Sequence, residues 1–177
     1  DTKATSPMTI NLTFGKSHTE IRWTDRREMT FADFGVILNK PKVGNKNGEC
    51  YTPATFSGTA RRMDQTERID IAVLDSDCGH SLIEIKNALT AQGWEAIIHS
   101  THSHMGDTTL IAAQPFEKWQ QDNGNKGIAD YLLEKKGYLP RILQGAEIID
   151  EMRDGAARNL VVKHQPCPKY RVIVLLA

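Results

Sequence analysis

The sequence predicts a domain of the α/β (α+β) class, and three observations lead to this prediction. The chain has 177 residues and 40% of them are hydrophobic, which is enough for one domain or a compact two-lobed unit with a real core. Apolar runs typical of strands alternate with segments of helical pattern. The clearest alternation, over residues 69–99, is strand, helix, strand, which favours a parallel pair inside a mixed sheet.

The first part of the chain predicts a small N-terminal α/β lobe. Thr30 precedes a short helix with three apolar residues on one face. Residues 39–48 are rich in lysine, asparagine and glycine, so we expect a loop there. The expected strands of this lobe cover residues 8–14, 20–23 and 50–56, with the second pairing with the first through a tight turn.

The central segment is the best defined. An apolar strand over residues 69–74 is followed by Ser81 and Glu84, which have the spacing of a capping box. Gly93 is a natural stop for the helix that this box opens. The next strand covers residues 94–99. We expect the two strands to be parallel neighbours joined by the helix.

The last part of the chain predicts a helical insertion between strands of the core, over about residues 115–155. Expected helices begin at Phe116, at Ile128 and at Ala146, and a strand over 108–112 returns antiparallel before them. Two strands then close the pattern, over residues 160–163 and 170–176. We interpret residues 1–177 as a single domain whose two ends look like cuts through a longer protein.

Charge and cysteine content exclude few classes of function. There are 22 basic and 22 acidic residues, so composition does not announce a nucleic-acid partner. Lys42 and Lys46 in one loop, and Arg61 and Arg62 in another, form local basic clusters that could bind a nucleic-acid backbone, although by themselves they favour an ordinary solvated loop. The 3 cysteines form no Cys-x-x-Cys pair, so neither a zinc site nor a disulfide framework is indicated.

No apolar run is long enough to span a membrane, and no signal peptide is visible. A protein of the reducing cytoplasm is therefore the expectation.

Asp75 and Asp77 are the most informative residues. They end an apolar strand with i, i+2 spacing, so both can face the same side. Two carboxylates there suit a hard cation such as Mg²⁺ or Mn²⁺. The alternative is that they only cap the following helix.

A second polar cluster, Ser100 to His104, follows the next predicted strand. If the strand continues, alternation places His102 and His104 on one face. Since the ends of parallel neighbours adjoin, this cluster and the two aspartates are expected to form one site that binds phosphate, sugar or metal. The alternative is a surface loop. Lys169 and Arg171, at the start of the last strand, suit a phosphate group, or are an ordinary charged strand start.

These pieces in this order resemble the archaeo-eukaryotic primase (primase-polymerase) superfamily, in the form found in phage and plasmid replication proteins. The pieces are Val73-Leu74-Asp75-Ser76-Asp77, Ile98 to His104, and Tyr170 to Leu176. The resemblance implies a catalytic core related to the RNA-recognition-motif fold. It also implies primer synthesis on a single-stranded DNA template by two-metal nucleotidyl transfer, with nucleoside triphosphates as substrates and a helicase domain or subunit as a further partner.

The resemblance also assigns roles. Asp75 and Asp77 match the metal-binding acids, and His104 is the expected catalytic imidazole. Ser100, His102, His104, Lys169 and Arg171 are the expected nucleotide-binding residues. The third metal-binding acid of the family is not found, since Asp107 and Glu84 are poorly placed for that role. A bacterial host with a phage or plasmid gene is the implied setting.

Two other classes stay open. A rolling-circle replication or relaxase nuclease would use His102 and His104 as a metal pair and Tyr131 or Tyr138 as nucleophile, although Ser103 stands where that class has a hydrophobic residue. It would leave Asp75 and Asp77 without a role. A primase-like module that binds nucleic acid without catalysis is the second alternative, because the third acid is missing.

Overall fold

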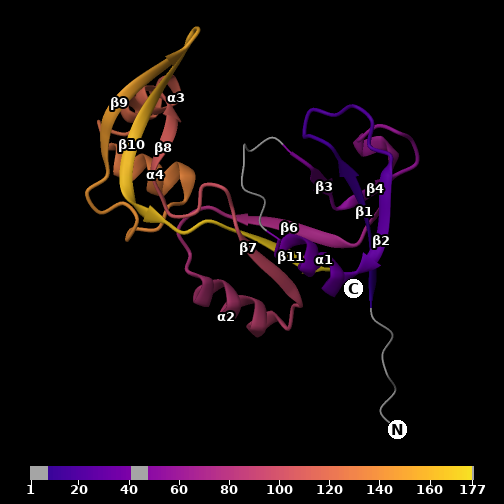
Figure 1. Cartoon of the computed structure of the whole chain (residues 1–177). Coiled ribbons are helices and arrows are strands. Elements are labelled where there is room, and N and C mark those ends of the chain that lie inside the picture. The colour runs from indigo at the N-terminus through magenta and orange to yellow at the C-terminus, as the bar shows by residue number, and fades with distance from the viewer. Residues whose placement is uncertain (1–7, 41–47, 177) are drawn as a thin grey trace. The chain divides into compact units, whose positions relative to one another are not determined.

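The structure is a computed structural model that describes residues 8–40 and 48–176 (Figure 1). The chain divides into two compact units, each described here by itself. Unit 1 comprises Asp1–Leu74, Leu89–His99 and Arg171–Ala177, and unit 2 comprises Asp75–Ala88 and Ser100–Tyr170. The class is α+β, with small antiparallel sheets. In the part of the chain that the structure describes, no helix is long and apolar enough to cross a membrane.

The N-terminal part of unit 1 is a three-stranded antiparallel sheet with one helix. Its elements are β1 (Thr9–Gly15), β2 (Asp25–Thr30), α1 (Phe31–Leu38) and β3 (Cys50–Thr52), in the sheet order β2-β1-β3. The Thr30 hydroxyl caps α1 by accepting the Asp33 N–H (3.0 Å), as the sequence predicted. The inward residues of β1 pack against Phe31 and Phe34 of α1.

The expected pairing of residues 20–23 with β1 was wrong. β2 pairs with β1 instead, in a register that sets Ile10 opposite Met29. Trp23 is buried, and its indole N–H donates to the Glu20 carbonyl (2.7 Å). Arg22 forms an antiparallel bridge with Ala60, and the Trp23 N–H donates to Thr59 O (2.6 Å), so this segment pairs with a later part of the chain and not with β1. Between β3 and the centre lie β4 (Ala54–Phe56), the 3-10 helix η1 (Met63–Gln65) and β5 (Thr66–Ile69).

The central sheet has the order β6-β11-β7, formed by β6 (Ile71–Ser76), β11 (Tyr170–Leu175) and β7 (Ala96–Ser100). The end of β11 lies at the start of both outer strands, because Leu176 N–H donates to Asp70 O (2.9 Å) and Leu175 N–H to Glu95 O (3.1 Å). β11 is thus antiparallel to both strands, and β6 and β7 run in the same direction.

The prediction that the strands carrying Asp75 and Ser100 are neighbours was therefore wrong. β11 lies between them, which places the backbones of β6 and β7 roughly 10 Å apart, or two strand spacings. The sequence could not reveal this, because the separating strand comes 70 residues after Ser100 in the chain. The connection itself was predicted correctly. Helix α2 (Leu82–Gln92) joins β6 to β7.

The capping box that opens α2 is confirmed. The Ser81 hydroxyl accepts the Glu84 N–H (3.3 Å), and the Glu84 carboxylate accepts the Ser81 N–H (2.6 Å). Gly93 follows the helix with a φ of +66°, the left-handed conformation that glycine adopts without strain.

The larger part of unit 2 is an antiparallel sheet packed against two helices. The sheet order is β8-β10-β9, and the elements are β8 (Gly106–Ala112), α3 (Ala113–Asp122), α4 (Ile128–Lys136), β9 (Glu147–Asp154) and β10 (Ala157–Cys167). α3 and α4 cover one face through an aromatic cluster in which Phe116 and Trp119 contact Tyr131. The expected return strand over 108–112 is confirmed as part of β8.

The helical insertion over about 115–155 was wrong in its last third. The two expected helices are present as α3 and α4. Residues 147–154, however, form the strand β9, which pairs with β10, and they do not form a third helix. Gly155 (φ +56°) makes the two-residue turn between these strands. The Asp154-Gly155 pair before an apolar run was the signal for this hairpin.

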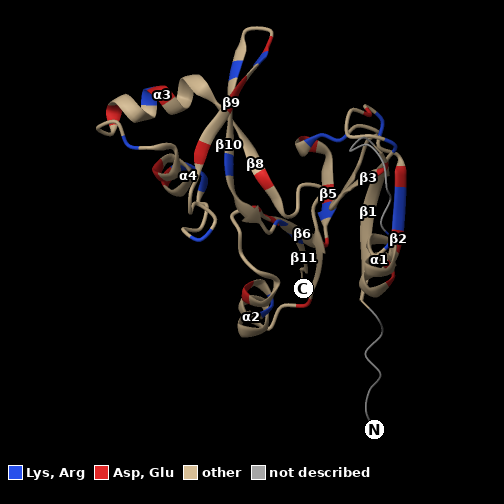
Figure 2. Cartoon of the chain, turned by 60° about the vertical axis from the view of Figure 1, so that its left-hand side comes forward, with Lys and Arg blue, Asp and Glu red and all other residues tan. Residues whose placement is uncertain are grey.

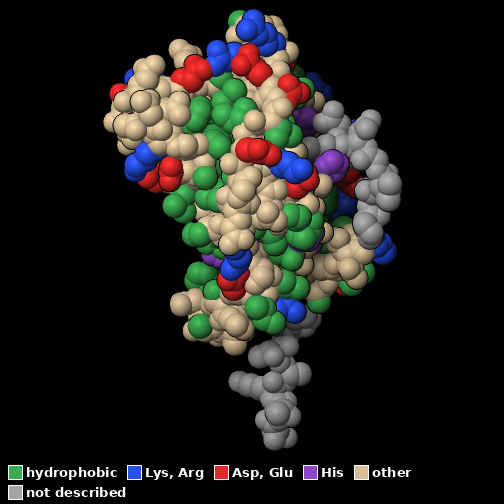
Figure 3. Space-filling model, turned by 90° about the vertical axis from the view of Figure 1, so that its left-hand side faces the viewer, with side chains coloured by type: hydrophobic (Ala, Val, Ile, Leu, Met, Phe, Trp, Pro, Cys, Tyr) green, Lys and Arg blue, Asp and Glu red, His purple; other side chains and the backbone are tan. Residues whose placement is uncertain are grey.

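The outer strand β9 of unit 2 is exposed along its whole length. Figure 3 shows hydrophobic side chains reaching this surface beside a row of acidic groups. Ile148, Ile149 and Met152 are 44–53% exposed. β9 also carries four carboxylates, visible as red bands in Figure 2. Charges on an outer strand oppose pairing with a second copy.

Candidate functional site

Asp75 and Asp77 lie at the end of β6, in unit 2. Both are exposed, as is Leu74 before them, and Ser76 between them is half-buried. Asp75 is within the strand, and Asp77 is the first residue after it. The two acids thus flank one inward-facing residue, which agrees with carboxylates on a common exposed side. Whether they bind a metal stays a prediction.

Ser100 ends β7, and the residues after it, up to Met105, form a turn and do not continue the strand. Thr101 O accepts the His104 N–H (3.0 Å), and Met105 has a φ of +60°. The alternation that would have placed His102 and His104 on one strand face is therefore absent. His102 is exposed, whereas His104 is half-buried.

The residues before β11 hold this turn in place. Lys169 O accepts the Thr101 N–H (3.1 Å), and Cys167 O accepts the Met105 N–H (2.9 Å). The His104 ring lies 4.8 Å from the Tyr170 ring, between centroids. Cys167 also contacts the end of β6, because its thiol donates to Asp77 O (3.5 Å). The segment 167–170 thus contacts both polar clusters of the predicted site.

The contacts of His104 assign its tautomer. Its Nδ1 atom lies 3.1 Å from the Lys169 backbone N–H, which can only donate. The Lys169 carbonyl is also near Nδ1 (3.0 Å), but it accepts from the Thr101 N–H with either tautomer, whereas the Lys169 N–H can donate to Nδ1 only if Nδ1 carries no proton. We therefore assign Nδ1 as the acceptor and Nε2 as the protonated nitrogen. In this form His104 offers a hydrogen-bond donor, which suits a phosphate oxygen rather than a metal ion.

Two buried hydroxyls lie beside these clusters. Ser76 Oγ and Thr101 Oγ1 have no hydrogen-bond partner among the residues that the structure describes. They come from the ends of β6 and β7, one on each side of the segment 167–170. Buried polar atoms are nearly always paired with protein, water or a ligand. Thr101 Oγ1 supports a polar ligand beside the His104 turn, whereas Ser76 Oγ faces away from the Asp75 and Asp77 carboxylates.

The donor set fits a hard cation bound by two carboxylates. Mg²⁺ commonly takes one or two protein carboxylates and completes its shell with phosphate oxygens and water. Among the described residues, no group of three or more His, Cys, Asp or Glu side chains could hold a metal ion. The third acid is accordingly not found. Glu84 is engaged with Arg141 and Ser81, and Asp107 is an exposed residue of β8.

The other predicted residues are less informative. Ser100 is the last residue of β7, and Lys169 precedes β11 as a half-buried residue of unit 2. Arg171 is half-buried in β11 and belongs to unit 1. Their roles in binding a nucleotide stay predictions from the sequence.

Of the two predicted basic clusters, the structure describes only Arg61 and Arg62. Arg61 lies over the Trp23 ring, with its guanidinium carbon 4.7 Å from a ring centroid, and Arg62 pairs with Asp64 (3.0 Å). Lys42 and Lys46 lie outside the described residues. Arg61 and Arg62 therefore have structural contacts of their own, and nucleic-acid binding by these four residues stays a prediction.

Two residues that sequence reasoning did not single out contact the loop that begins at Asp77. Cys167 is fully buried, and burial raises the pKa of its thiol, so it stays protonated and can donate to Asp77 O. Arg141 donates to Gly79 O (2.9 Å), two residues after Asp77. Neither residue has a local motif that could have revealed it.

Comparisons with models of protein families, with curated proteins and with solved structures return no match.

Proposed function

We propose that this chain is a nucleotidyltransferase of the primase-polymerase type, which extends a primer on a single-stranded DNA template and requires a divalent metal. The observation that carries the proposal is that two polar clusters, one after β6 and one after β7, both contact the segment 167–170. The exposed carboxylates of Asp75 and Asp77 follow β6, and His104, held with Nε2 protonated, follows β7. The segment 167–170 contacts both sides.

Each group has a distinct role in this proposal. Asp75 and Asp77 hold Mg²⁺ or Mn²⁺. The bound metals would lower the pKa of the attacking hydroxyl and neutralise the leaving pyrophosphate. His104 donates from Nε2 to a phosphate oxygen of the nucleoside triphosphate, and its ring is held by Lys169 N–H and by Tyr170. The Thr101 hydroxyl can pair with a polar group of the same ligand.

The strand order supports the same proposal. In β6, α2, β7 the two parallel strands are separated by an antiparallel third strand, β11. This split βαβ arrangement belongs to the ferredoxin-like family of motifs, the topology expected of a core related to the RNA-recognition motif. Many functions share that topology, so it supports the fold of the proposal and does not establish the reaction.

The nuclease alternative fits the same contacts less well. Its nucleophile would be Tyr131 or Tyr138, which are 6% and 7% exposed. Tyr131 packs between Phe116 and Trp119, and Tyr138 packs on His164, so neither can reach a DNA phosphate without unpacking. His104 as a metal ligand would also require the other tautomer. An inactive primase-like module remains the second candidate, and the experiment below distinguishes it.

The test is primer extension with a labelled nucleotide on a primed single-stranded template, with Mn²⁺ or Mg²⁺. We expect the wild-type protein to extend the primer, and Asp75→Asn with Asp77→Asn to reduce extension to background. Both acids are exposed, so the double variant should keep the wild-type circular dichroism spectrum and melting temperature.

Asp107→Asn is the matched control, because Asp107 is an exposed acid of the same unit. It should keep full activity. Extension by the double variant at the wild-type rate would refute the metal assignment. A wild-type protein that binds the template but extends no primer with any nucleotide would support the inactive module instead.

A further inference from the structure

The loop between β6 and α2, residues 77–81, is fastened through its backbone. Three consecutive carbonyl groups of this loop each accept a hydrogen bond from a residue far away in the chain. The carbonyls of Asp77, Cys78 and Gly79 accept from Cys167 Sγ (3.5 Å), Leu139 N–H (3.0 Å) and the Arg141 guanidinium (2.9 Å), respectively. The loop that carries Asp77 is thus held along its length.

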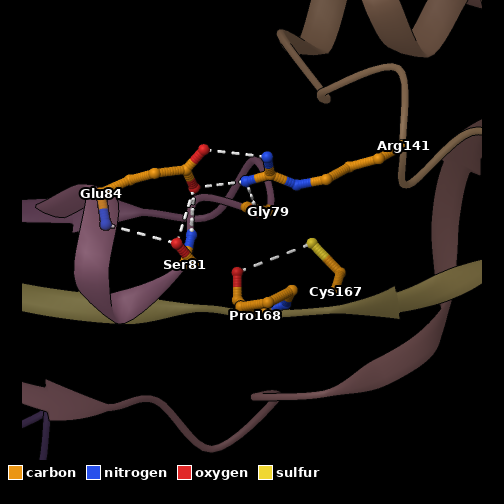
Figure 4. Close-up of polar contacts among 6 residues, drawn as sticks. All are labelled: Gly79, Ser81, Glu84, Arg141, Cys167 and Pro168. Carbon is orange, nitrogen blue, oxygen red and sulfur yellow. Dashed lines mark hydrogen bonds and ion pairs between the residues drawn. The ribbon is translucent and has the colours of Figure 1, made fainter.

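Arg141 joins this loop to the start of α2 (Figure 4). One guanidinium nitrogen donates to Glu84 Oε1 (2.9 Å), and the other donates to both Glu84 Oε2 and Gly79 O. The same Glu84 carboxylate accepts the Ser81 N–H (2.6 Å) and the Ser81 hydroxyl (2.9 Å). A single fork-shaped cation therefore ties together the loop backbone and the capping box of α2.

The pair is charged over the whole range in which an enzyme works. The Arg141 guanidinium and then the Ser81 donors lower the pKa of Glu84 to about 2. The side chains are 49% and 41% exposed, however, and exposed ion pairs add little to global stability. Because Arg141 contacts both Glu84 and the Gly79 carbonyl, the main effect of this pair is to fix the conformation of the loop.

The loop also packs closely against the Arg141 segment. Gly79 has a φ of +98°, and a Cβ atom at this position would lie 2.3 Å from Ile142 Cγ1. The backbone of the loop thus lies directly on the residue after Arg141. Movement of either segment would displace the other.

We propose that Arg141 is a positioning residue that, with Glu84, fixes the loop carrying Asp77 and so sets where the Asp77 carboxylate is presented. The link to metal binding rests on the function proposed above, whereas the fastening of the loop does not. The two parts are therefore tested by separate measurements.

The first measurement is the rate of thiol labelling in the native protein, resolved by peptide mass. The Cys167 thiol is fully buried and bonded to Asp77 O, so it reacts only when its surroundings open, and movement of this loop is one route to that opening. We expect Arg141→Ala to raise the labelling rate of Cys167 roughly two- to fivefold, the range of an exposed ion pair. An unchanged rate overturns the proposal.

Lys126→Ala is the matched control. Lys126 pairs with Glu134 (2.7 Å) in the same unit, and the side chains are 47% and 40% exposed, close to the values for Arg141 and Glu84. Loss of this pair should leave the labelling rate of Cys167 at the wild-type value. An equal rise in both variants would show general loosening and would overturn the proposal.

The second measurement is the Mn²⁺ dependence of primer extension. Arg141→Ala should raise the Mn²⁺ concentration for half-maximal rate more than it lowers the rate at saturating Mn²⁺, because a displaced carboxylate binds the metal more weakly. Arg141→Lys keeps the charge without the fork and should fall between. A wild-type Mn²⁺ dependence in Arg141→Ala would overturn the positioning role. If the wild-type protein has no activity, the proposed function fails, and the labelling rate still decides whether Arg141 fastens the loop.

Discussion

Gly79 is the residue at which backbone conformation and packing leave the least choice. Its φ of +98° is rarely adopted by residues with a side chain, and an added Cβ would collide with Ile142. The loop after the predicted metal site therefore requires glycine for two independent reasons. Gly145 meets only the first, since its φ is +72° and an added Cβ would contact nothing within 4 Å.

We predict that Gly79→Ala destabilises the protein far more than Gly145→Ala. The control variant should cost about 1–3 kcal/mol for the unfavourable φ alone. The Gly79 variant adds the collision with Ile142, and we expect a clearly lower melting temperature or failure to fold. Thermal unfolding of both variants is the measurement. Equal melting temperatures would mean that the loop does not lie on Ile142 as described.

A second prediction at this scale concerns pH. The pKa of Glu84 is lowered to about 2 from an ordinary value of 4.5, so its contribution to stability is complete above about pH 4.5 and is lost as the pH falls towards 2. The urea midpoint of the wild type should exceed that of Glu84→Gln at pH 6. The difference should shrink steadily below pH 4.5. Arg141→Ala, which removes the same ion pair, should follow the same course, and a difference independent of pH would contradict the assignment.

The site could be predicted only where its signals are local. Asp75 and Asp77 stand two residues apart, and Ser81 and Glu84 have the three-residue spacing of a cap, so short-range patterns found all four. Arg141 lies 57 residues from Glu84, and Cys167 lies 90 residues from Asp77. Contacts at such separations depend on the whole fold and carry no pattern of their own.

At the scale of elements, helices and strands with strong local signals were predicted well, and β9 was not. Its sequence Glu147–Asp154 is rich in residues that favour helices. It is nevertheless a strand, because it pairs with β10, where Val161 lies opposite Asp150. Strand formation depends on the neighbouring strand more than on intrinsic preference. The strand β11 was predicted, but its position between β6 and β7 was missed for a similar reason, since the order of strands in a sheet is a tertiary property.

We predict that the aromatic cluster between α3 and α4 is a main source of stability in unit 2. Phe116 is 4% exposed and contacts both Trp119 and Tyr131. Phe116→Ala should lower the free energy of unfolding by about 3–5 kcal/mol. Leu133→Ala on α4 is the control, because Leu133 is 44% exposed and should cost much less. Urea unfolding measures both, and similar losses would contradict the packing described.

At the scale of the whole molecule, the two units differ in continuity. Unit 1 is assembled from three stretches of chain, whereas residues 100–170 of unit 2 form one unbroken stretch. This stretch contains every residue of the larger hydrophobic cluster, from Ile111 to Cys167. The cluster of unit 1 instead needs Ile173, which is fully buried and follows the others by about a hundred residues.

We therefore predict that a fragment of residues 100–170 folds alone, whereas a fragment of residues 1–74 does not. The first exceeds the roughly 60 residues at which many domains fold by themselves. Circular dichroism with thermal melting, and dispersion of amide signals in NMR spectra, test both fragments. A cooperative transition is expected for the first fragment only. If residues 100–170 stay unfolded, their core depends on the β6–α2 loop.

The position of β11 also imposes an order in time on a growing chain. β6 and β7 leave the ribosome early, and the strand that joins them follows only at Tyr170. Until then both carry unpaired backbone groups, and closing so long a connection is slow. Residues 100–170 can fold first, and β11 can then insert between β6 and β7. A nascent chain thus carries Asp75 and Asp77 well before the sheet that supports them exists, and in that interval its open strand edges are exposed to aggregation and to chaperones.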